Sequence, residues 1–351
     1  MNDRGLTPVV RLAPAKLNLT LAVLGVRTDG YHSIHSVMVP LALADRLSLA
    51  RAAGTEDSLH VVGEDRRPVA DATAYDSVLR GIAEARRVIG RGAETFALAA
   101  RLEKRIPVAA GLAGGSSDAA AAIDGAIEAW GAEVSPDDRR RAAAAAGSDV
   151  PFFLAGRAAL VEGRGERVTP LSPLQGEPPG VLLVTPAAPL STQAAFRALD
   201  TEPAARPANT GSTRLSSEHL AAELGPAHAP MRSADLVLRA GVLAVANDLA
   251  NAADLVLPGL RPLRRALTRL LGVPIGLSGS GPTLWALYPA LAGAEEAALR
   301  VREEVALGLL DSPGDGPPFV TATTIVAATA ATAATATTAT ATTAAPPGRE
   351  S

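Results

Sequence analysis

The chain contains no cysteine among its 351 residues. Disulfide bonds and thiolate chemistry are therefore excluded, and the cysteine ligands of most structural zinc sites are missing. No apolar run reaches the roughly 18 residues that a membrane-spanning helix needs, and residues 1–15 lack the charged start and apolar core of a signal peptide. We therefore expect a cytoplasmic protein with no membrane partner.

Aromatic side chains and lysines are also scarce. Hydrophobic residues make up 48% of the chain and aromatic residues 3%, so alanine supplies much of the apolar content. Lys16 and Lys104 are the only lysines, which makes Lys16 easy to notice. The formal net charge of −3 gives no electrostatic reason to expect a nucleic-acid partner. The length predicts one or two domains with a substantial core.

The most informative segment present is residues 106–118, which read Ile-Pro-Val-Ala-Ala-Gly-Leu-Ala-Gly-Gly-Ser-Ser-Asp. Gly111, Gly114 and Gly115 can take positive φ and let a ligand approach the backbone. The glycine spacing matches neither G-x-x-x-x-G-K-[ST] nor G-x-G-x-x-G, which argues against the common NTPase loop and against a dinucleotide site. The preceding residues 95–102 are typical of a strand, so the local unit is strand, glycine loop and helix.

The helix that follows this loop carries the functional argument. Ser116 or Ser117 can cap it, ahead of the alanine run 119–122. The first N–H groups of a helix are unpaired and partly positive, so a glycine loop that opens onto them can bind phosphate. A plain glycine turn before a helix is common, and the segment alone leaves both readings open.

Three further segments resolve this ambiguity. Residues 13–19 read Ala-Pro-Ala-Lys-Leu-Asn-Leu, residues 25–32 read Gly-Val-Arg-Thr-Asp-Gly-Tyr-His, and residues 277–283 read Leu-Ser-Gly-Ser-Gly-Pro-Thr. With the central loop and Gly-Ser-Asp-Val-Pro-Phe-Phe at 147–153, they resemble the GHMP kinase superfamily, which includes galactokinase, homoserine kinase, mevalonate kinase and phosphomevalonate kinase. Within it, the chain is most similar to the kinases of the non-mevalonate isoprenoid pathway whose acceptor is a cytidine-diphosphate methylerythritol.

The resemblance runs from about Val10 to about Val326 and implies the fold. We expect an α+β, two-domain GHMP-kinase-like fold with the active site in the interdomain cleft. Residues 1–165 would form the N-terminal domain and residues 166–326 the C-terminal domain. The Ala/Thr-rich residues 327–351 lack large apolar side chains and are expected to be a disordered, dispensable tail.

The resemblance also implies the cofactors, ATP and Mg²⁺, and their place in the central loop. Ala109 and Ala110 stand where relatives often have glycine, and their extra methyl groups should fit if these positions keep negative φ, although they weaken the case for a backbone N–H contact there. Asp118 either helps a Mg²⁺ shell through water or favours the helix N-terminus electrostatically, and we prefer the second reading. The residues expected to bind the nucleotide are Pro107, Val108, Ala109, Ala110, Gly111, Leu112, Ala113, Gly114, Gly115, Ser116 and Ser117.

Asp149 and Lys16 are the candidate catalytic residues. From sequence alone, Asp149 reads as the cap of a turn and Lys16 as a solvated strand residue. The resemblance implies instead that Asp149 accepts the proton of the acceptor's 2-hydroxyl and that Lys16 favours the ionised Asp149. Asn18 lies two residues after Lys16 on the same strand face, and is expected to hydrogen-bond the acceptor.

Substrate specificity is expected at the Asp-Gly-Tyr-His corner. Tyr31 offers a ring on which a pyrimidine can stack, and His32 offers hydrogen-bonding groups to the base edge. Phe196 can add a second ring, with Thr192 near the diphosphate, although Phe196 is equally compatible with the core. Without the resemblance, Tyr31 and His32 read as a turn packed on the sheet. His32 and His35 are three residues apart, but with no cysteine or carboxylate cluster nearby we expect no metal site.

Two other functions stay open at this stage. The first is another kinase of the superfamily, acting on homoserine, mevalonate or a sugar. The second is a non-catalytic relative that binds ATP or a metabolite as a sensor, which would need neither Lys16 nor Asp149. The oligomeric state is expected to be a monomer or a homodimer.

The remaining predictions concern single elements. Asn247-Asp248 is compatible with a helix cap, and Gly279 and Gly281 with a wall near the phosphates. We expect strands at 12–24 and 181–185, helices at 76–89, 136–147, 233–246 and 260–271, a strand–glycine loop–strand unit at 274–288, and a surface excursion at 201–217.

Overall fold

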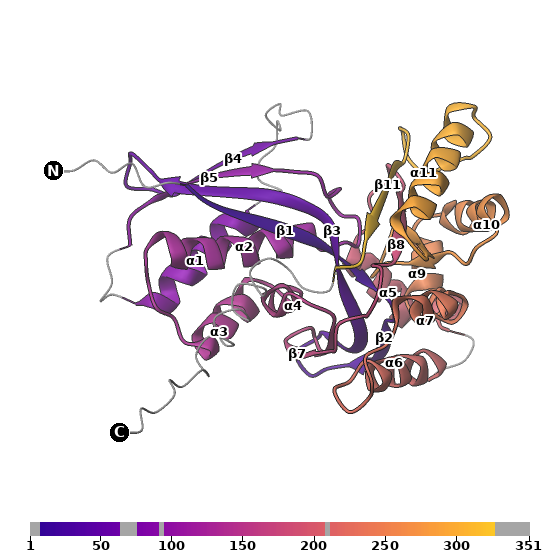
Figure 1. Ribbon diagram of the computed structural model, residues 1–351, viewed down its shortest axis with the longest axis horizontal. Helices are drawn as coiled ribbons and strands as arrows, with labels where there is room; N and C mark the ends of the chain where they lie inside the picture. The colour runs from indigo at the N-terminus through magenta and orange to yellow at the C-terminus, as the bar shows by residue number, and fades with distance from the viewer. Residues whose placement is uncertain (1–7, 64–75, 91–94, 208–210, 327–351) are drawn as a thin grey trace, which may run out of the picture.

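The computed structural model describes residues 8–63, 76–90, 95–207 and 211–326, which form an α+β structure with two β-sheets (Figure 1). The sheets meet where Leu41 pairs with Ile325 and where the Val326 amide donates to the Pro40 carbonyl at 3.0 Å. The expected tail at 327–351 lies outside the described residues.

The first sheet is organised around β3 (His32–Arg51), a strand of 20 residues. It pairs antiparallel with β1, β2, β5 and β6, while β7 extends the sheet from β6 and β4 runs parallel to β5. The other strands of this sheet are β1 (Val9–Asn18), β2 (Ala22–Val26), β4 (Ser58–Val62), β5 (Leu98–Glu103), β6 (Ala159–Gly163) and β7 (Arg167–Pro170).

The single strand expected at 12–24 is wrong, because the chain forms β1 and β2 with a break between them. Leu19 and Thr20 both direct their amides to the carbonyl of Val37, and Leu21 leaves the sheet to pair with Asn247. The pattern of apolar residues continues through this break, so it could not reveal the change of partner.

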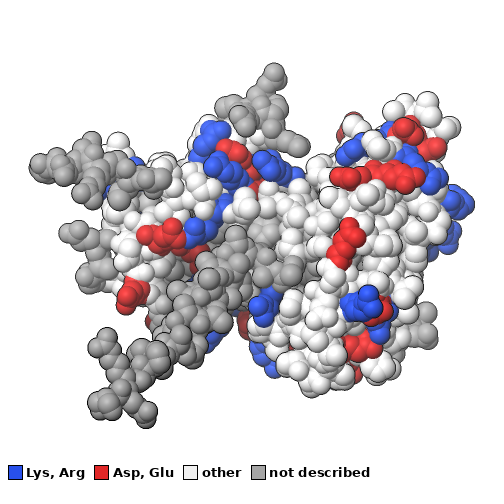
Figure 2. Space-filling model, in the orientation of Figure 1, with Lys and Arg blue, Asp and Glu red and all other residues white. Residues whose placement is uncertain are grey.

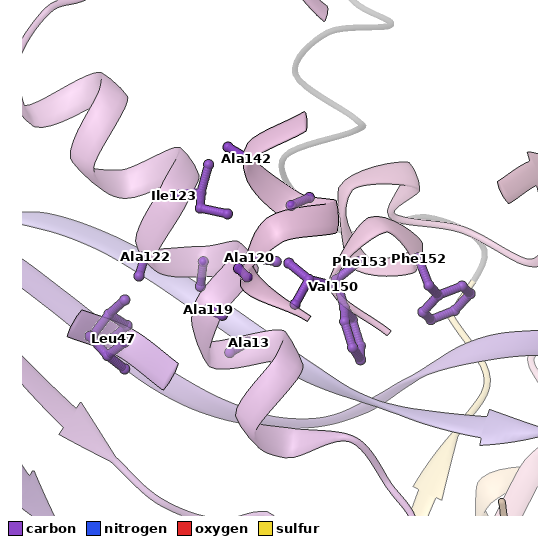
Figure 3. Close-up of a cluster of buried hydrophobic side chains, with 14 of the residues drawn as sticks. Ala13, Leu47, Ala119, Ala120, Ala122, Ile123, Ala142, Val150, Phe152 and Phe153 are labelled. Atoms are coloured by element: carbon purple, nitrogen blue, oxygen red, sulfur yellow. The ribbon is translucent and has the colours of Figure 1, made fainter. Parts of the chain in front are cut away.

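Four helices cover one face of the first sheet, namely α1 (Ser77–Ile89), α2 (Gly114–Ala129), α3 (Pro136–Ala146) and α4 (Val150–Ala155). The alanines of α2 allow a close approach to β1 and to the neighbouring helices (Figure 3). At Gly81 of α1, a Cβ would lie 2.5 Å from the Ala119 carbonyl oxygen, so the contact between α1 and α2 requires glycine. The alanine-rich composition is thus used for tight helix packing.

Two of these helices confirm the sequence predictions. The predicted helix at 76–89 is α1, and the predicted helix at 136–147 is α3. Ser135 caps α3 by accepting a hydrogen bond from the Asp138 amide at 3.1 Å, with Pro136 in the first helical position. Gly147 ends the helix.

The second sheet is antiparallel, in the order β11-β8-β10-β9, and both of its faces are buried. Along β8, Leu182 and Val184 pack with helices α10 (Leu260–Leu271) and α11 (Leu291–Ala306), whereas Val181 and Leu183 share a core with the end of the first sheet. This alternation is the period of two of a strand. The strands are β8 (Gly180–Thr185), β9 (Gly276–Leu277), β10 (Leu284–Tyr288) and β11 (Phe319–Thr324).

The predicted strand at 181–185, the helix at 260–271 and the strand–loop–strand unit at 274–288 are confirmed by β8, α10, and β9 with β10. The helix predicted at 233–246 is wrong, because the backbone departs from helical geometry at Arg239 and two short helices form. The remaining helices are α5 (Thr192–Thr201), a 3₁₀ turn η2 (Pro203–Ala205), α6 (Ser212–Glu223), α7 (Ser233–Leu238), α8 (Ala240–Leu243), α9 (Ala250–Val256), α10 (Leu260–Leu271) and α11 (Leu291–Ala306).

The surface excursion expected at 201–217 is wrong at its C-terminal end. Helix α6 begins at Ser212 and buries Thr213 and Ser217, the latter completely. A polar, proline-bearing stretch predicts exposure, but here small hydroxyl residues fill polar positions inside the molecule.

Acidic and basic side chains are intermingled on the face seen in Figure 2, in agreement with the small net charge. In the part of the chain that the structure describes, none of the helices combines the length and apolar character needed to cross a membrane.

Candidate functional site

A cavity of about 1160 Å³ lies where the two halves of the fold meet. Segments far apart in the sequence line it: β1, the turn before β3, the glycine loop with the start of α2, the turn before α4, the start of α5, and the loop between β9 and β10. The predicted site residues that line it are Lys16, Asn18, Tyr31, His32, Pro107, Val108, Ala109, Ala110, Gly111, Ala113, Gly114, Gly115, Ser116, Asp149, Thr192 and Phe196.

The glycine loop has a more constrained backbone than its composition predicts. Gly111 has φ +74°, but Gly114 and Gly115 are helical residues at the start of α2. The condition of negative φ is not met at Ala109, which has φ +54°, and Ala113 has φ +55°. The left-handed conformation costs an alanine roughly 1–2 kcal/mol, so contacts with the rest of the fold must hold this loop in place.

The N-terminus of α2 opens into the cavity without a side-chain cap. Neither Ser116 nor Ser117 caps the helix as expected, since it begins at Gly114 and its N-cap residue is Ala113. The amides of its first turn are therefore free of side-chain caps, which is the arrangement that binds anions at helix N-termini. Leu112 and Ser117, also predicted to bind the nucleotide, are buried and do not line the cavity.

The carbonyl oxygen of Gly111 connects the glycine loop with the Lys16 segment and with the β9–β10 loop. It accepts hydrogen bonds from Lys16 Nζ at 2.7 Å and from Ser278 Oγ at 3.0 Å. A Cβ at Gly111 would lie 2.4 Å from the Ser278 carbonyl oxygen and 2.8 Å from that of Gly281. The β9–β10 loop therefore packs directly on the glycine loop.

Asn247 holds the β9–β10 loop from behind. Its Nδ2 donates to the carbonyl oxygens of Leu277 at 2.9 Å and Gly279 at 2.8 Å, and its Oδ1 accepts from the Leu249 amide at 2.9 Å. Asp248 accepts from the Val23 amide at 2.9 Å. Gly279 lines the cavity, and Gly281 does not. Asn247 and Asp248 thus join the loop, β2 and the start of α9.

Lys16 is buried in β1, with a relative exposure of 3%, so its interpretation as a solvated strand residue is wrong. Its ammonium donates to Asn18 Oδ1 as well as to the Gly111 carbonyl. Burial lowers the pKa of Lys16 below its ordinary value, and the negative charge of Asp149 opposes this decrease. The structure thus brings Lys16, Asn18 and Asp149 together from two distant parts of the chain.

Asp149 lies on the turn before α4 and lines the cavity. It occupies the N-cap position of α4, but its side chain makes no capping hydrogen bond. The capping role that the sequence alone favours is therefore wrong, and the carboxylate faces the cavity within electrostatic range of Lys16.

Asp118 takes neither of the roles considered for it. It is fully buried, and its Oδ2 lies 2.8 Å from Lys104 Nζ, which also contacts Asp45. Asp45 Oδ1 accepts from the amides of Arg105 and Ile106 at 2.5 and 2.9 Å. This buried triad of Asp45, Lys104 and Asp118 fixes the chain where it enters the glycine loop.

The expected pyrimidine corner contains two groups of stacked side chains. The His32 and Phe196 rings stack with centroids 4.6 Å apart and planes 26° apart, and His32 Nε2 lies 2.9 Å from Asp200 Oδ1. The Arg164 guanidinium lies over the half-exposed Tyr31 ring, 5.4 Å from its centroid.

Sequence reasoning missed Asp200 and Arg164, both of which line the cavity. Asp200 could have been found from its place four residues after Phe196 on the same helix face. No signal in the sequence indicated Arg164, which reaches Tyr31 from the turn between β6 and β7. The Thr192 hydroxyl lies 2.8 Å from Ser280 Oγ and links α5 to the β9–β10 loop.

Comparisons with known proteins agree with this geometry. Residues 77–157 match the model of the GHMP kinases N terminal domain. The 4-diphosphocytidyl-2-C-methyl-D-erythritol kinase of Symbiobacterium thermophilum is 38% identical over 281 residues, covering 78% of this chain and 89% of the relative. The kinase of the same name from Deinococcus radiodurans is 38% identical over 296 residues, covering 83% and 89%.

Two solved structures resemble this chain over most of its length. A crystal structure of 4-(cytidine 5′-diphospho)-2C-methyl-D-erythritol kinase is 30% identical, with a TM-score of 0.62 and coverage of 90% of this chain and 99% of that one. Homoserine kinase from Cytophaga hutchinsonii shares the fold at 15% identity, with a TM-score of 0.62 and coverage of 93% and 97%.

Proposed function

We propose that this chain, which belongs to the family of 4-diphosphocytidyl-2-C-methyl-D-erythritol kinases within the GHMP kinases, transfers the γ-phosphoryl group of ATP to the 2-hydroxyl of 4-diphosphocytidyl-2-C-methyl-D-erythritol. The reaction belongs to the non-mevalonate route to isoprenoid precursors. The observation that carries the proposal is the meeting in one cavity of an open helix N-terminus, the Lys16–Asp149 pair and the aromatic corner at Tyr31.

The nucleotide phosphates would bind at the glycine loop and the first turn of α2. The amides of Gly114, Gly115 and Ser116 are the first of the helix, and these residues line the cavity. Such amides favour anions without any contribution from a side-chain cation. Residues 107–111 and Ala113 would form the wall of the same subsite.

Mg²⁺ would be held by the ATP phosphate oxygens together with the hydroxyl of Ser116, which lines the cavity in the first turn of α2. The fit rests on the preference of Mg²⁺ for oxygen ligands. When bound, the ion would neutralise charge that develops on the phosphates during transfer. Ser117 Oγ is buried outside the cavity lining and has no hydrogen-bond partner among the described residues, so it is not counted among the ligands.

Asp149 and Lys16 would act on the acceptor hydroxyl. Phosphoryl transfer requires that the attacking oxygen is placed in line and that its proton has an acceptor nearby. Asp149 accepts this proton, because its carboxylate faces the cavity and caps nothing. The Lys16 ammonium stabilises the negative charge on the carboxylate and on the acceptor oxygen, while Asn18 completes the polar wall beside it.

Recognition of the cytidine would take place at the corner formed by Tyr31, His32 and Phe196. Tyr31 is half-exposed and presents a ring to the cavity, and base–aromatic stacking contributes about 1–3 kcal/mol per base. His32 is held by Phe196 and Asp200, so its orientation is set before the substrate arrives. Thr192, at the start of α5, would lie near the diphosphate.

The expected domain division and cellular context remain part of the proposal. The first sheet ends at Pro170 and the second begins at Gly180, so the division between the sheets lies between these residues, a few positions after the expected boundary at residue 165. A cytoplasmic site of action, and a monomeric or homodimeric state, agree with a pathway enzyme that uses ATP.

The proposal is tested by ADP release from ATP·Mg²⁺ with three acceptors side by side. We expect turnover with 4-diphosphocytidyl-2-C-methyl-D-erythritol, and none with homoserine or mevalonate. Turnover with homoserine or mevalonate instead would preserve the kinase assignment but reject the cytidine subsite. Binding of ATP without turnover of any acceptor would support a sensor.

A further inference from the structure

A continuous chain of buried hydroxyl and amide groups leads away from Lys16 into the protein. Lys16 donates to Asn18 Oδ1, Asn18 Nδ2 donates to Ser36 Oγ at 2.8 Å, and Ser36 Oγ donates to the Thr20 carbonyl oxygen at 2.5 Å. Lys16 and Asn18 are each 3% exposed, Thr20 is 1% exposed, and Ser36 is fully buried. Ser36 and Thr20 are therefore shielded from water, whereas Lys16 and Asn18 border the cavity with little of their surface exposed.

The order of donors and acceptors in this chain fixes the orientation of the Asn18 amide. A serine hydroxyl has one hydrogen to donate, and Ser36 gives it to the Thr20 carbonyl. Ser36 can therefore offer Asn18 only a lone pair, so the Asn18 amide must turn its NH₂ toward Ser36. Its oxygen then faces Lys16, whose ammonium can only donate.

In the opposite orientation, the Asn18 NH₂ would face the Lys16 ammonium, so that two donors would meet. The Asn18 oxygen would face the Ser36 oxygen, so that two acceptors would meet with no hydrogen between them. In a buried site, each unsatisfied polar group carries the full penalty of its lost hydration. The energy difference between the two orientations is therefore large enough to hold the amide in one of them.

We propose that Ser36 is a positioning residue for the phosphoryl transfer, which holds the Asn18 carboxamide oxygen on the Lys16 ammonium. The inference rests on the proposed function for its catalytic consequence, but the geometry that it describes belongs to the free protein. Ser36 touches neither the cavity nor Lys16 itself.

The far end of the chain is anchored by α6. Thr20 Oγ1 accepts from the Val37 amide at 3.0 Å and donates to Ser217 Oγ at 2.8 Å. Ser217 in turn lies 2.8 Å from His35 Nδ1. Helix α6 thus closes a network that begins at the active-site lysine, which explains why its hydroxyl side chains are buried.

Loss of the Ser36 hydroxyl should change the pKa of Lys16. Asp149 is the charged group that acts on Lys16, and it would be unchanged. The other groups that contact the ammonium are the neutral Asn18 amide and the Gly111 carbonyl. An Asn18 amide free to rotate would remove one oxygen from the ammonium and lower the pKa of Lys16 further.

The scarcity of lysine makes this measurable. The chain has two lysines, Lys16 and Lys104, so lysine labelled with carbon-13 at the ε position gives two NMR signals. Lys16→Arg removes one of them and assigns both. In Ser36→Ala, the midpoint of the Lys16 titration should move to lower pH, whereas the midpoint of Lys104, held by Asp45 and Asp118, should stay the same.

The rate of turnover provides a second, independent measurement. Ser36→Ala should lower kcat about tenfold and shift the basic limb of its pH profile to lower pH, with the KM for ATP unchanged. Ser233→Ala is the matched control, since Ser233 is a buried serine outside the cavity whose Oγ has no hydrogen-bond partner. Ser233→Ala should change neither the midpoint of the Lys16 titration nor kcat and its pH profile.

An unchanged Lys16 midpoint in Ser36→Ala would overturn the proposal, whatever the effect on stability. Should that variant not fold, Ser36→Cys takes its place, because it keeps the size but replaces the hydroxyl with a much weaker hydrogen-bonding group. A wild-type protein inactive on all three acceptors would reject the proposed function, while the lysine titration would still decide the role of Ser36.

Discussion

Lys104 and Asp118 form a buried ion pair beneath the glycine loop, with 2.8 Å between Nζ and Oδ2. Asp45 contacts the same ammonium, so two carboxylates share one positive charge. Burial raises the pKa of Asp118 to about 7, with the charge of Lys104 opposing this increase. The two carboxylates raise the pKa of Lys104 above its ordinary value, although burial alone would lower it.

This pair predicts a pH-dependent stability. Because the pKa of Asp118 is higher in the folded than in the unfolded chain, the folded state holds its proton more tightly. Stability is therefore lost as the pH rises from about 4 to about 7, by at most about 1.4 kcal/mol per pH unit. Asp118→Asn should flatten this part of the curve, as measured by chemical unfolding at several pH values. Parallel curves for the two proteins would contradict the shift.

Asp149→Asn should lower kcat by a factor of about 10²–10⁴, the usual contribution of a general base. ATP binding should change little, because the nucleotide subsite is built from the backbone of α2 and its preceding loop. Steady-state turnover and ATP titration measure the two effects. Asp137→Asn on the exposed start of α3 is the control. Near-wild-type turnover of Asp149→Asn would reject Asp149 as the proton acceptor.

Tyr31→Ala should raise the KM for the cytidine substrate by roughly 5- to 150-fold, from a lost stacking energy of about 1–3 kcal/mol. The KM for ATP should stay the same, because the proposed assignment places the cytidine at Tyr31 and the ATP phosphates at the glycine loop. Initial rates with each substrate varied in turn provide the measurement. Equal increases in both values would contradict a stacking role.

Gly111→Ala should destabilise the protein by about 2–5 kcal/mol, the sum of overpacking and a left-handed alanine. Its Cβ would lie 2.4 Å from the Ser278 carbonyl oxygen. Gly272→Ala is a matched control, because Gly272 has φ +68° but nothing within 4 Å of a Cβ, so it reports the backbone cost alone. Equal losses of unfolding free energy in the two variants would show that the contact with Ser278 has no energetic effect.

Local signals in the sequence predicted several elements correctly. Ser135 and Pro136 define the start of α3 because a capping side chain and a fixed φ act within one turn. The resemblance of the glycine loop and its companion motifs identified the kinase fold. It also led to the expectation that Lys16 and Asn18 act together, and they are in contact.

Features that depend on distant partners could not be predicted in this way. The left-handed Ala109 violates the preference of alanine, and the Ala110 carbonyl beside it accepts a hydrogen bond from the Thr283 amide, far along the chain, at 3.3 Å. Asp118 follows two serines at a helix start, where an N-terminal role is the natural reading, and its partner Lys104 becomes visible only in three dimensions. The burial of Ser217 likewise depends on Thr20 and His35.

The Gly111 carbonyl oxygen receives Lys16 from one side and Ser278 from the other. A backbone atom of the glycine loop, together with Asn18 Oδ1, therefore positions the ammonium that we propose acts on the acceptor. A shift of the loop by a few tenths of an ångström would change the hydrogen bond to Lys16 directly, with no intervening element to absorb it. A displacement of the glycine loop, where we propose that ATP binds, would thus also displace the lysine that we propose acts on the second substrate. The two subsites of this kinase therefore cannot be repositioned independently.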